Sequence, residues 1–192
     1  MPEQQAETPS FAQAWAEARE VRPKVVVKAD LVPAISVLSM VGLLGIPLGW
    51  IWSRLAPTQR MRVVSAEGDP IALQLESWHR FDALAIFALM GLATGLVVGV
   101  AVWFLRERRG PVVLLAAVGG SLLAAWLGMR MGIAFADSLH AVTGTPNVGD
   151  IVEKAPVLES GWVVIAQPLT VALAYGVLAT WNSRDDLGRR LG

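Results

Sequence analysis

Four long apolar stretches constrain this chain more than any other feature of its sequence. They cover residues 31–53, 83–105, about 111–135, and 161–181. Only the third contains a charged side chain, Arg130, which lies near its end and can extend its guanidinium to the membrane surface. About 20 apolar residues in a helix cross a bilayer core of about 30 Å. The sequence therefore predicts an all-α membrane protein with four transmembrane helices at these positions.

Composition supports a membrane protein and excludes several other classes. Hydrophobic residues make up 54% of the 192 residues and charged residues only 17%, whereas soluble domains contain about 25% charged residues. The 16 basic residues balance the 16 acidic ones, so no excess of positive charge predicts a nucleic-acid partner. The chain has no cysteine, which excludes disulfides, thiolate metal ligands and a thiol nucleophile.

The distribution of Lys and Arg predicts the orientation. Ten of them lie in the N-terminal segment 1–30, the short second connection and the C-terminal tail 182–192, against five in the connections 54–82 and 136–160. The positive-inside rule then places both termini in the cytoplasm and the two longer connections outside the cytoplasmic (inner) membrane. The first stretch is too long for a cleavable signal peptide, so we expect a retained anchor. Residues 31–181 should form one compact membrane domain.

Six of the eight tryptophans lie at or near the predicted helix ends, where indole side chains favour the headgroup layer. The sequence predicts interfacial positions for all six. They are Trp50, Trp52, Trp78, Trp103, Trp162 and Trp181.

Local patterns outside the four stretches predict two further elements. Ser10 can cap a helix on which Phe11 and Trp15 share one face, which favours a partly amphipathic N-terminal segment, with a polar tail as the alternative. Turn-type residues at 67–70 separate two β-prone runs and predict a small β-hairpin in the first outer connection. Two strands alone are marginal in water, so the hairpin should pack against the second outer connection, 136–160, or against another protein. The connection 136–160 itself is expected to be irregular.

Small residues recur at four-residue intervals in the second and third stretches, and prolines interrupt the first and fourth. Small-residue grooves let two helix backbones approach closely, and the two sets lie at similar depth, so we predict a tight hairpin of stretches two and three. The alternative is that glycine is simply common in transmembrane helices. Pro47 and the Gln167-Pro168 pair mark possible kinks; the alternative is that either is tolerated in its helix without a role. The small residues are Gly91, Gly95 and Gly99, and Gly120, Ala124, Gly128 and Gly132.

A cluster of polar residues at the outer ends of stretches two and three is the main candidate for chemistry. An intramembrane Arg is costly without a partner, so we expect an interfacial ion pair between Asp82 and Arg130. His79, Asp82, Asp137 and His140 could instead bind a divalent metal. The spacing matches no established metal motif, so the interfacial interpretation is preferred.

Signatures of catalysis are missing from the sequence. It contains no phosphate-binding glycine loop, no Gly-x-Ser-x-Gly and no His-Glu-x-x-His. Apart from Arg130, no Asp, Glu, Lys, Arg or His lies within the four stretches, and Gln167 is the only sizeable polar side chain at depth. We therefore expect neither catalytic residues nor a cofactor.

The chain resembles an actinobacterial membrane-protein family known only as domain of unknown function twenty-five sixty-seven. The resemblance begins with the end of the first stretch near residues 55–57 and the run Glu-Ser-Trp-His-Arg-Phe-Asp at 76–82. It continues through Trp103, Arg-Arg-Gly-Pro at 108–111, the Gly119-Gly120 pair and Ala155-Pro156, and covers about residues 31–181. It implies a four-span integral protein of the cell envelope, and no reaction, cofactor or catalytic residue.

Together these features favour a non-enzymatic accessory or scaffold protein. Its partners would be the lipid bilayer and a membrane-protein partner or a second copy of the chain, and not nucleic acid. Two alternatives remain open, namely a small transport or permeation component working as an oligomer, and a metal-dependent envelope enzyme.

Overall fold

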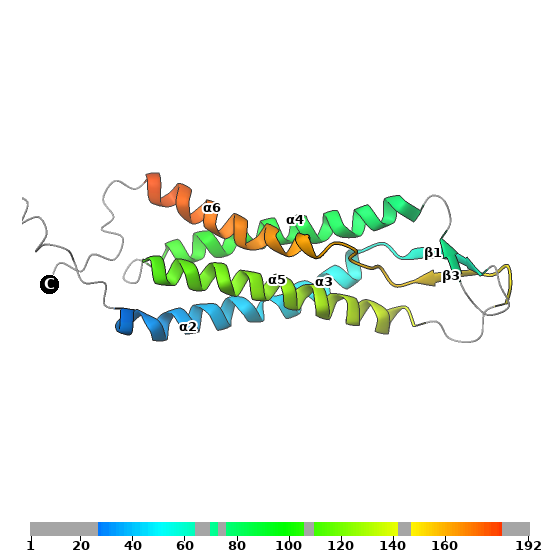
Figure 1. The fold of residues 1–192 in the computed structure, drawn as a ribbon, viewed down its shortest axis with the longest axis horizontal. Coiled ribbons are helices and arrows are strands. Elements are labelled where there is room, and N and C mark those ends of the chain that lie inside the picture. The colour runs from blue at the N-terminus through cyan, green and yellow to red at the C-terminus, as the bar shows by residue number, and fades with distance from the viewer. Residues whose placement is uncertain (1–26, 64–69, 73–75, 106–109, 142–146, 182–192) are drawn as a thin grey trace, which may run out of the picture.

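Four helical segments, each long and apolar enough to cross a membrane, run side by side in the computed structural model of the chain (Figure 1). The structure describes residues 27–63, 70–72, 76–105, 110–141 and 147–181. The predicted four-helix architecture is confirmed. The four segments are Leu31–Leu55, Trp78–Trp103, Pro111–Leu139 and Gly161–Trp181.

The individual helices extend or divide the predicted stretches. The helices are α2 (Val27–Leu43), α3 (Gly45–Leu55), α4 (Glu76–Trp103), α5 (Pro111–Leu139), the 3₁₀ helix η2 (Gly161–Ile165) and α6 (Ala166–Trp181). Helix α4, which corresponds to the second predicted stretch, begins at Glu76, seven residues before the predicted start at residue 83. The polar residues before the apolar stretch are therefore helical too. The predicted amphipathic region around Ser10, Phe11 and Trp15 and the tail 182–192 lie outside the described residues.

The first and fourth spans are interrupted next to Pro47 and Pro168, whereas Pro33 lies inside the continuous helix α2. Leu44 separates α2 from α3, three residues before Pro47. The 3₁₀ helix η2 changes to α6 just before Pro168. A proline lacks the N–H that bonds the carbonyl four residues earlier, and its ring crowds that carbonyl. The two interruptions predicted from these prolines are therefore present.

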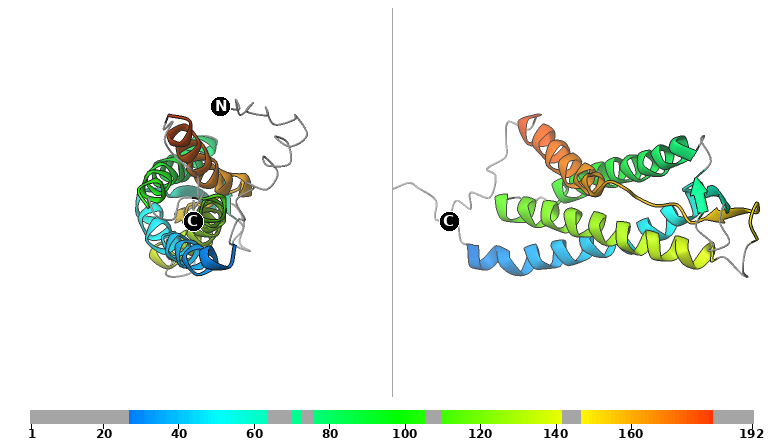
Figure 2. Two further views of the ribbon diagram at one scale, coloured as in Figure 1. Left: turned by 90° about the vertical axis from the view of Figure 1, so that its left-hand side faces the viewer. Right: turned by 45° about the vertical axis from the view of Figure 1, so that its right-hand side comes forward.

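The spans place both ends of the helical domain on one side. The first helix begins, and α6 ends, at the end of the bundle that we call the terminal end, as the views in Figures 1 and 2 show. At the opposite end, the cap end, the two longer connections fold together (Figure 1). An even number of spans produces this arrangement.

A three-stranded antiparallel sheet forms the cap. Its strands are β1 (Gln59–Val63), β2 (Pro70–Ala72) and β3 (Ile151–Lys154), in the order β2-β1-β3. The hairpin predicted in the first connection is confirmed, and it packs against the second connection as expected. The second connection is not wholly irregular, however, because four of its residues form β3. The pairing with β1 supplies the third strand that a marginal hairpin needs.

The helices pack as two pairs of alternate spans. One pair is α4 with α6, and the other is α5 with the consecutive helices α2 and α3. The consecutive spans α4 and α5 make few contacts with each other. The two pairs contact each other mainly through α5 and α6.

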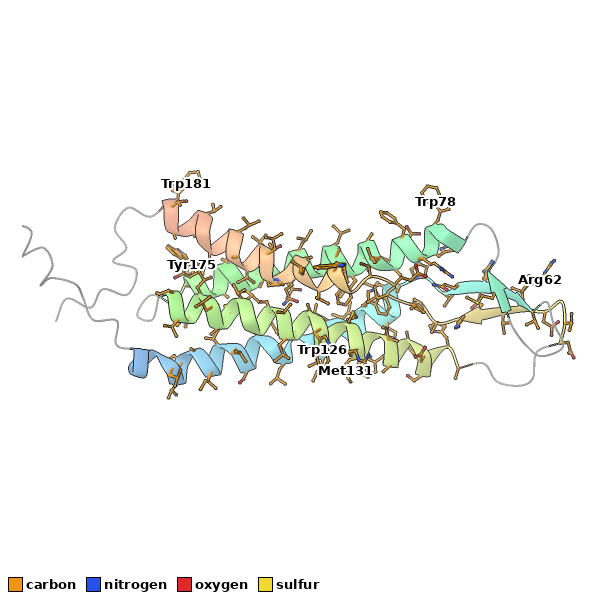
Figure 3. The ribbon with its side chains drawn as sticks, in the orientation of Figure 1. Arg62, Trp78, Trp126, Met131, Tyr175 and Trp181 are labelled. Carbon is orange, nitrogen blue, oxygen red and sulfur yellow. The ribbon has the colours of Figure 1, made fainter. Side chains whose placement is uncertain are left out.

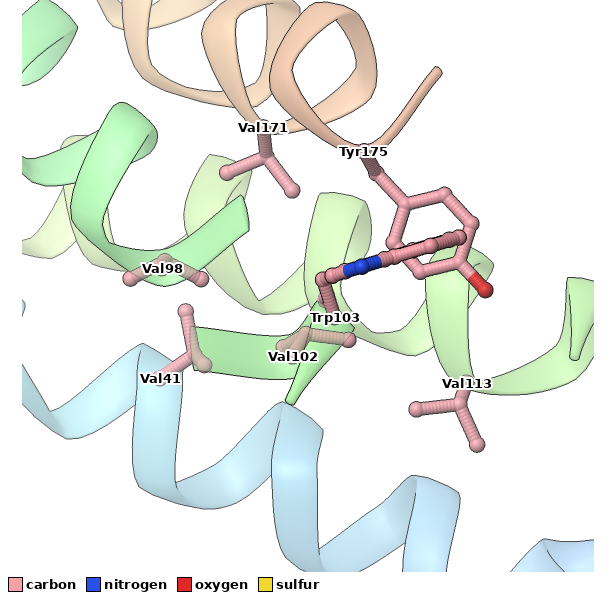
Figure 4. Packing of buried hydrophobic residues seen from close by; sticks show 8 residues of the cluster. Val41, Val98, Val102, Trp103, Val113, Val171 and Tyr175 are labelled. Carbon is pink, nitrogen blue, oxygen red and sulfur yellow. The ribbon is translucent and has the colours of Figure 1, made fainter. Parts of the chain in front are cut away.

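Two clusters of buried hydrophobic residues join the pairs. The terminal-end cluster, shown in Figure 4, contains Val41, Val98, Val102, Trp103, Val113, Ala117, Val171 and Tyr175. The cap-end cluster contains Trp52, Ala56, Ala83, Phe87, Ala136, Ala155, Leu158 and Val163.

Two of the six tryptophans predicted at the interface belong to these clusters instead. Trp52 is fully buried and Trp103 is 7% exposed. Both lie near helix ends, as predicted, but on the faces that point into the bundle. The exposed Trp78 and Trp181 project away from opposite ends of the bundle, as interfacial side chains would (Figure 3).

Candidate functional site

The small residues of α4 bring its backbone against α6. A Cβ atom added at Gly95 would lie 2.4 Å from the carbonyl oxygen of Gln167, and one at Gly99 would lie 2.8 Å from the Cβ of Ala174. A Cβ at Gly91 would lie 3.6 Å from Gln167, which is an ordinary contact distance. Gly95 and Gly99 therefore set the close approach of α4 to α6.

The small residues of α5 face the first span. A Cβ atom added at Gly120 would lie 2.8 Å from the carbonyl oxygen of Leu38, and one at Gly132 would lie 2.8 Å from the Trp52 ring. The first span also has glycines at this contact. A Cβ at Gly45 would lie 2.3 Å from the carbonyl oxygen of Ala124, and one at Gly49 would lie 2.6 Å from that of Gly128.

The prediction that the small residues of α4 and those of α5 pack against each other was wrong. The sets on α4 and α5 do not face each other, because each packs against a helix that is not its neighbour in sequence. Regular small-residue spacing identifies a face that admits a backbone, and it carries no information about which backbone occupies it. The glycines of α3, at the same spacing in the first span, were the missed signal.

The structure does not bring Asp82 and Arg130 together. In the described part of the chain, the basic side chain recorded beside Asp82 is His79, whose Nδ1 lies 4.0 Å from the carboxylate. Arg130 is exposed on α5 and forms no ion pair with Asp82. The predicted pairing fails because α4 and α5 do not pack as a close hairpin.

The four metal-ligand candidates do not gather either. Within the described ranges, no three His, Asp or Glu side chains are placed to hold a metal ion. His79 and Asp82 are neighbours on one turn of α4. Asp137 is exposed on α5, and the Nδ1 atom of His140 lies 3.1 Å from the carbonyl oxygen of Ala136 in its own helix.

The cap presents charged and apolar side chains on its outward face. Gln59, Met61 and Val63 of β1 are buried toward the bundle, and Arg60 and Arg62 alternate with them on the exposed face. Arg60 forms an ion pair of 3.5 Å with Glu153 on β3. Figure 3 shows that Arg62 projects away from the molecule at the cap end.

Apolar residues extend this outward face. Ile151, which lies opposite Arg62 in the register of β1 and β3, is 58% exposed, and Val148 is 57% exposed. The outward face of the cap is thus a mixed surface of cations and aliphatic side chains.

A non-helical segment, residues 155–160, fastens the cap to the bundle. We call it the strap. Ala155 and Leu158 of the strap are buried in the cap-end cluster. The strap ends beside an ion pair in which Arg80 Nη1 of α4 lies 2.5 Å from Glu159 Oε1.

Trp52 connects the two helix pairs beneath the strap. Its indole N–H donates a hydrogen bond of 2.9 Å to the carbonyl oxygen of Ala83 on α4, and its ring meets Phe87 edge-on with the centroids 6.1 Å apart. Sequence reasoning missed this role, because a tryptophan near a span end is typical of the interface. The spacing of Gly45, Gly49 and Trp52 puts all three on one face of α3, so the glycines were the signal that this face is covered.

A small cavity lies among the helices between the two clusters. Gln167 of α6 lines it together with apolar and small residues of α3, α4 and α5. Gln167 is 1% exposed, and its Nε2 has no hydrogen-bond partner. The polar side chain that stood out in the fourth stretch thus lies in the interior of the bundle.

Comparison with known proteins places the chain in a family. Residues 41–189 match the family described as protein of unknown function, DUF2567. The chain belongs to this family. The DUF2567 protein is 31% identical over 167 residues to an uncharacterized protein of Mycobacterium leprae, an alignment that covers 77% of this chain and 83% of the relative. No solved structure matches the chain significantly.

The family membership confirms the resemblance found in the sequence. The match to the family begins at Val41, within the first span, and includes the other three spans of this DUF2567 protein completely. It therefore also includes the cap and both hydrophobic clusters. Neither comparison attaches a reaction, ligand or partner to the fold.

Proposed function

We propose that this chain is a non-enzymatic accessory or scaffold protein of the bacterial cytoplasmic membrane. It would hold both termini in the cytoplasm and present the cap outside, where the cap would engage an envelope protein or a membrane complex. The observation that carries this proposal is the convergence of both long connections in one ordered sheet with a mixed charged and apolar outward face. Interface cores commonly combine aliphatic contacts with Arg.

Neither alternative from the sequence receives comparable support. The metal-dependent enzyme loses its candidate site, because the four candidate ligands do not converge. Ion permeation requires ionisable or strongly polar groups at depth. The buried side chains with polar atoms among the described residues are Ser53, Gln59, Ser121, Gln167 and Tyr175, and none of them is Asp, Glu, Lys, Arg or His. These uncharged residues are compatible only with transport of a small uncharged solute.

The orientation can be tested by cysteine labelling, because the chain has no native cysteine that would also react. We expect a Val148→Cys variant at the cap to react with a membrane-impermeant maleimide in intact cells. A Phe104→Cys variant, matched in exposure at the terminal end, should react only after the membrane is permeabilised. The reverse pattern would place the cap in the cytoplasm and refute the proposed orientation.

Partner engagement can be tested by site-specific crosslinking. A photo-reactive amino acid at Ile151 on the cap should crosslink a defined partner in native membranes, in an amount comparable with the chain itself. The same group at Leu115, which is 70% exposed on the helical surface of α5, is the matched control and should not capture that partner. Equal capture at both positions, or none at Ile151, would contradict a role of the cap as the docking surface.

A further inference from the structure

The free edges of the cap sheet offer backbone groups for further pairing. β2 and β3 lie on either side of β1, so each has one edge that no described strand covers. In an antiparallel sheet, successive residues direct their N–H and C=O groups to alternate sides of the strand. Every second residue of an outer strand therefore presents both groups at its free edge.

The hydrogen bonds of Val63 identify which residues of β1 face β3. The Val63 N–H donates a bond of 3.1 Å to the carbonyl oxygen of Asp150, and the Val63 carbonyl oxygen accepts one of 2.8 Å from the N–H of Gly149. Val63 thus directs both of its backbone groups toward β3. By alternation Met61 does the same, whereas Arg62 between them faces β2.

The register then identifies the residues at the free edge of β3. Met61 lies opposite Val152, so the backbone groups of Val152 bond to β1. Its neighbours Ile151 and Glu153 direct their N–H and C=O groups away from β1, and these groups form no hydrogen bond within the described part of the chain. Donors and acceptors of both residues therefore lie along the free edge of β3.

The free edge of β2 differs because it contains a proline. Arg62 lies opposite Ile71 in the register of β1 and β2, so the adjacent Pro70 is at the free edge of β2. Proline has no N–H to donate, and a proline on an outer strand is one way in which proteins prevent edge pairing. The sequence of β3, Ile-Val-Glu-Lys, has no proline. The edge of β2 thus lacks a donor that the edge of β3 retains.

An extended chain fits the open edge of β3. A strand repeats its N–H and C=O groups at the spacing of Ile151 and Glu153, and addition of a strand to a sheet edge is a common mode of peptide recognition. The side chains beside the edge restrict the sequence of the added strand. Ile151 is 58% exposed, which favours an apolar residue opposite it. The carboxylate of Glu153, which pairs with Arg60, disfavours an acidic residue opposite.

A second copy of the chain does not meet these requirements. β3 runs along the long axis of the bundle (Figure 1), so two copies inserted in one membrane in the same orientation would have parallel β3 strands. A twofold axis along these strands would exchange the two faces of the sheet. Residues at the same height would then project their side chains to opposite faces, whereas residues paired in a sheet project them to the same face.

We propose that the open edge of β3 binds an extended strand from an extracytoplasmic segment of another envelope protein. The bound strand extends the cap sheet, pairs with the backbone of Ile151 and Glu153, and places an apolar side chain beside Ile151. This inference rests on the proposed function, because it states how the cap engages its partner.

Removal of an edge N–H tests the proposal. A photo-reactive amino acid at Val148, which is 57% exposed beside β3, captures the partner in native membranes, and mass spectrometry of the crosslinked peptide identifies the bound segment. Ile151→Pro removes one edge donor and is compatible with the sheet, because Ile151 is the first residue of β3 and its N–H points away from β1. We expect crosslinking to fall by about fivefold, the effect of losing one backbone hydrogen bond.

Ile151→Val is the matched control and separates strand addition from the proposed function. It keeps the edge donor and should change crosslinking by less than about twofold. If Ile151→Pro and Ile151→Val capture the same segment to the same extent, the cap docks a partner but strand addition is refuted. If the protein with the probe at Val148 and no other change captures no defined segment, both proposals fail.

Hydrogen exchange shows whether the sheet persists in the proline variant. The Met61 amide faces β3 and should stay protected from exchange in Ile151→Pro. If this protection is lost, Glu153→Pro removes the other edge donor and takes the place of Ile151→Pro, with the same expected loss of crosslinking and the same refuting result.

Discussion

Contacts within the two helix pairs differ in kind from contacts between them. Within each pair, glycines bring one backbone directly against another, so that the space for even one methyl group is missing at Gly45 and Gly95. Between the pairs, side chains of the two clusters meet and a small cavity with an uncharged amide remains. Backbone contacts fix a single geometry, whereas side-chain clusters can repack. The pairs are therefore the rigid units of this fold, and the interface between them is its adaptable part.

The largest effect is expected inside the first pair. In Gly45→Ala the new Cβ would lie 2.3 Å from the carbonyl oxygen of Ala124, which belongs to the backbone and cannot rotate away. We expect the free energy of unfolding to fall by about 3 kcal/mol, the upper range for overpacking. Reversible unfolding in bicelles measures it. Gly176→Ala, where a Cβ meets nothing within 4 Å, is the control; an equal loss in both variants would show that the close contact at Gly45 is unimportant.

A somewhat smaller loss is expected inside the second pair. A Cβ atom at Gly95 would lie 2.4 Å from the carbonyl oxygen of Gln167, whereas one at Gly91, one turn away on the same face, would find 3.6 Å of space. We expect Gly95→Ala to cost about 2 kcal/mol and Gly91→Ala less than about 0.5 kcal/mol. The same unfolding assay compares them. If the two variants behaved alike, α4 and α6 would not be held at backbone distance.

Between the pairs, the hydrogen bond of Trp52 should give an intermediate effect. Trp52→Phe keeps a ring against Phe87 but removes the donor to the carbonyl oxygen of Ala83. We expect a loss of about 1.5 kcal/mol in the free energy of unfolding. Trp50→Phe, on the half-exposed face of α3, controls for loss of an indole and should change little. A larger loss than in Gly45→Ala would contradict the view that the interface between pairs is the softer one.

The smallest effect is expected at the surface. The Arg80 and Glu159 side chains are 38% and 56% exposed, and exposed ion pairs contribute about 0–1 kcal/mol. Arg80→Gln should therefore lower the free energy of unfolding by less than about 1 kcal/mol, and the difference from wild type should shrink as salt is raised. A difference that is independent of salt would show that Arg80 acts by packing against the strap and not by its charge.

The sequence predicts the spans well because length and hydropathy decide whether a helix can cross a membrane. It also locates the two interruptions, since Pro47 and Pro168 act on their own helices. The partners of the helices were not predictable in the same way. The faces marked by Gly95 and by Ala124 each accept any close backbone, and the choice among three other spans depends on the whole bundle.

Burial of the site residues was equally hard to predict. Trp52 and Trp50 are two positions apart at the end of one span. Trp52 is buried because it shares the face of Gly45 and Gly49, which packs against α5, whereas Trp50 lies off that face and is exposed. The ion pair expected between Asp82 and Arg130 depended on the incorrect helix pairing. Gln167 could be singled out because its chemistry is unusual for an apolar stretch, but the cavity beside it is formed by residues from four separate segments.

The pairing of alternate spans has a consequence for biosynthesis. A chain leaves the ribosome from its N-terminus, so α4 is made before α5 and well before α6. The glycine-lined face of α4 therefore contacts lipid or the insertion machinery until α6 has been made. The hairpin of the cap likewise waits for β3, which is made after α5. This protein cannot assemble hairpin by hairpin as it emerges. The first pair can form once α5 is made, whereas the second pair and the two clusters between the pairs require the fourth span.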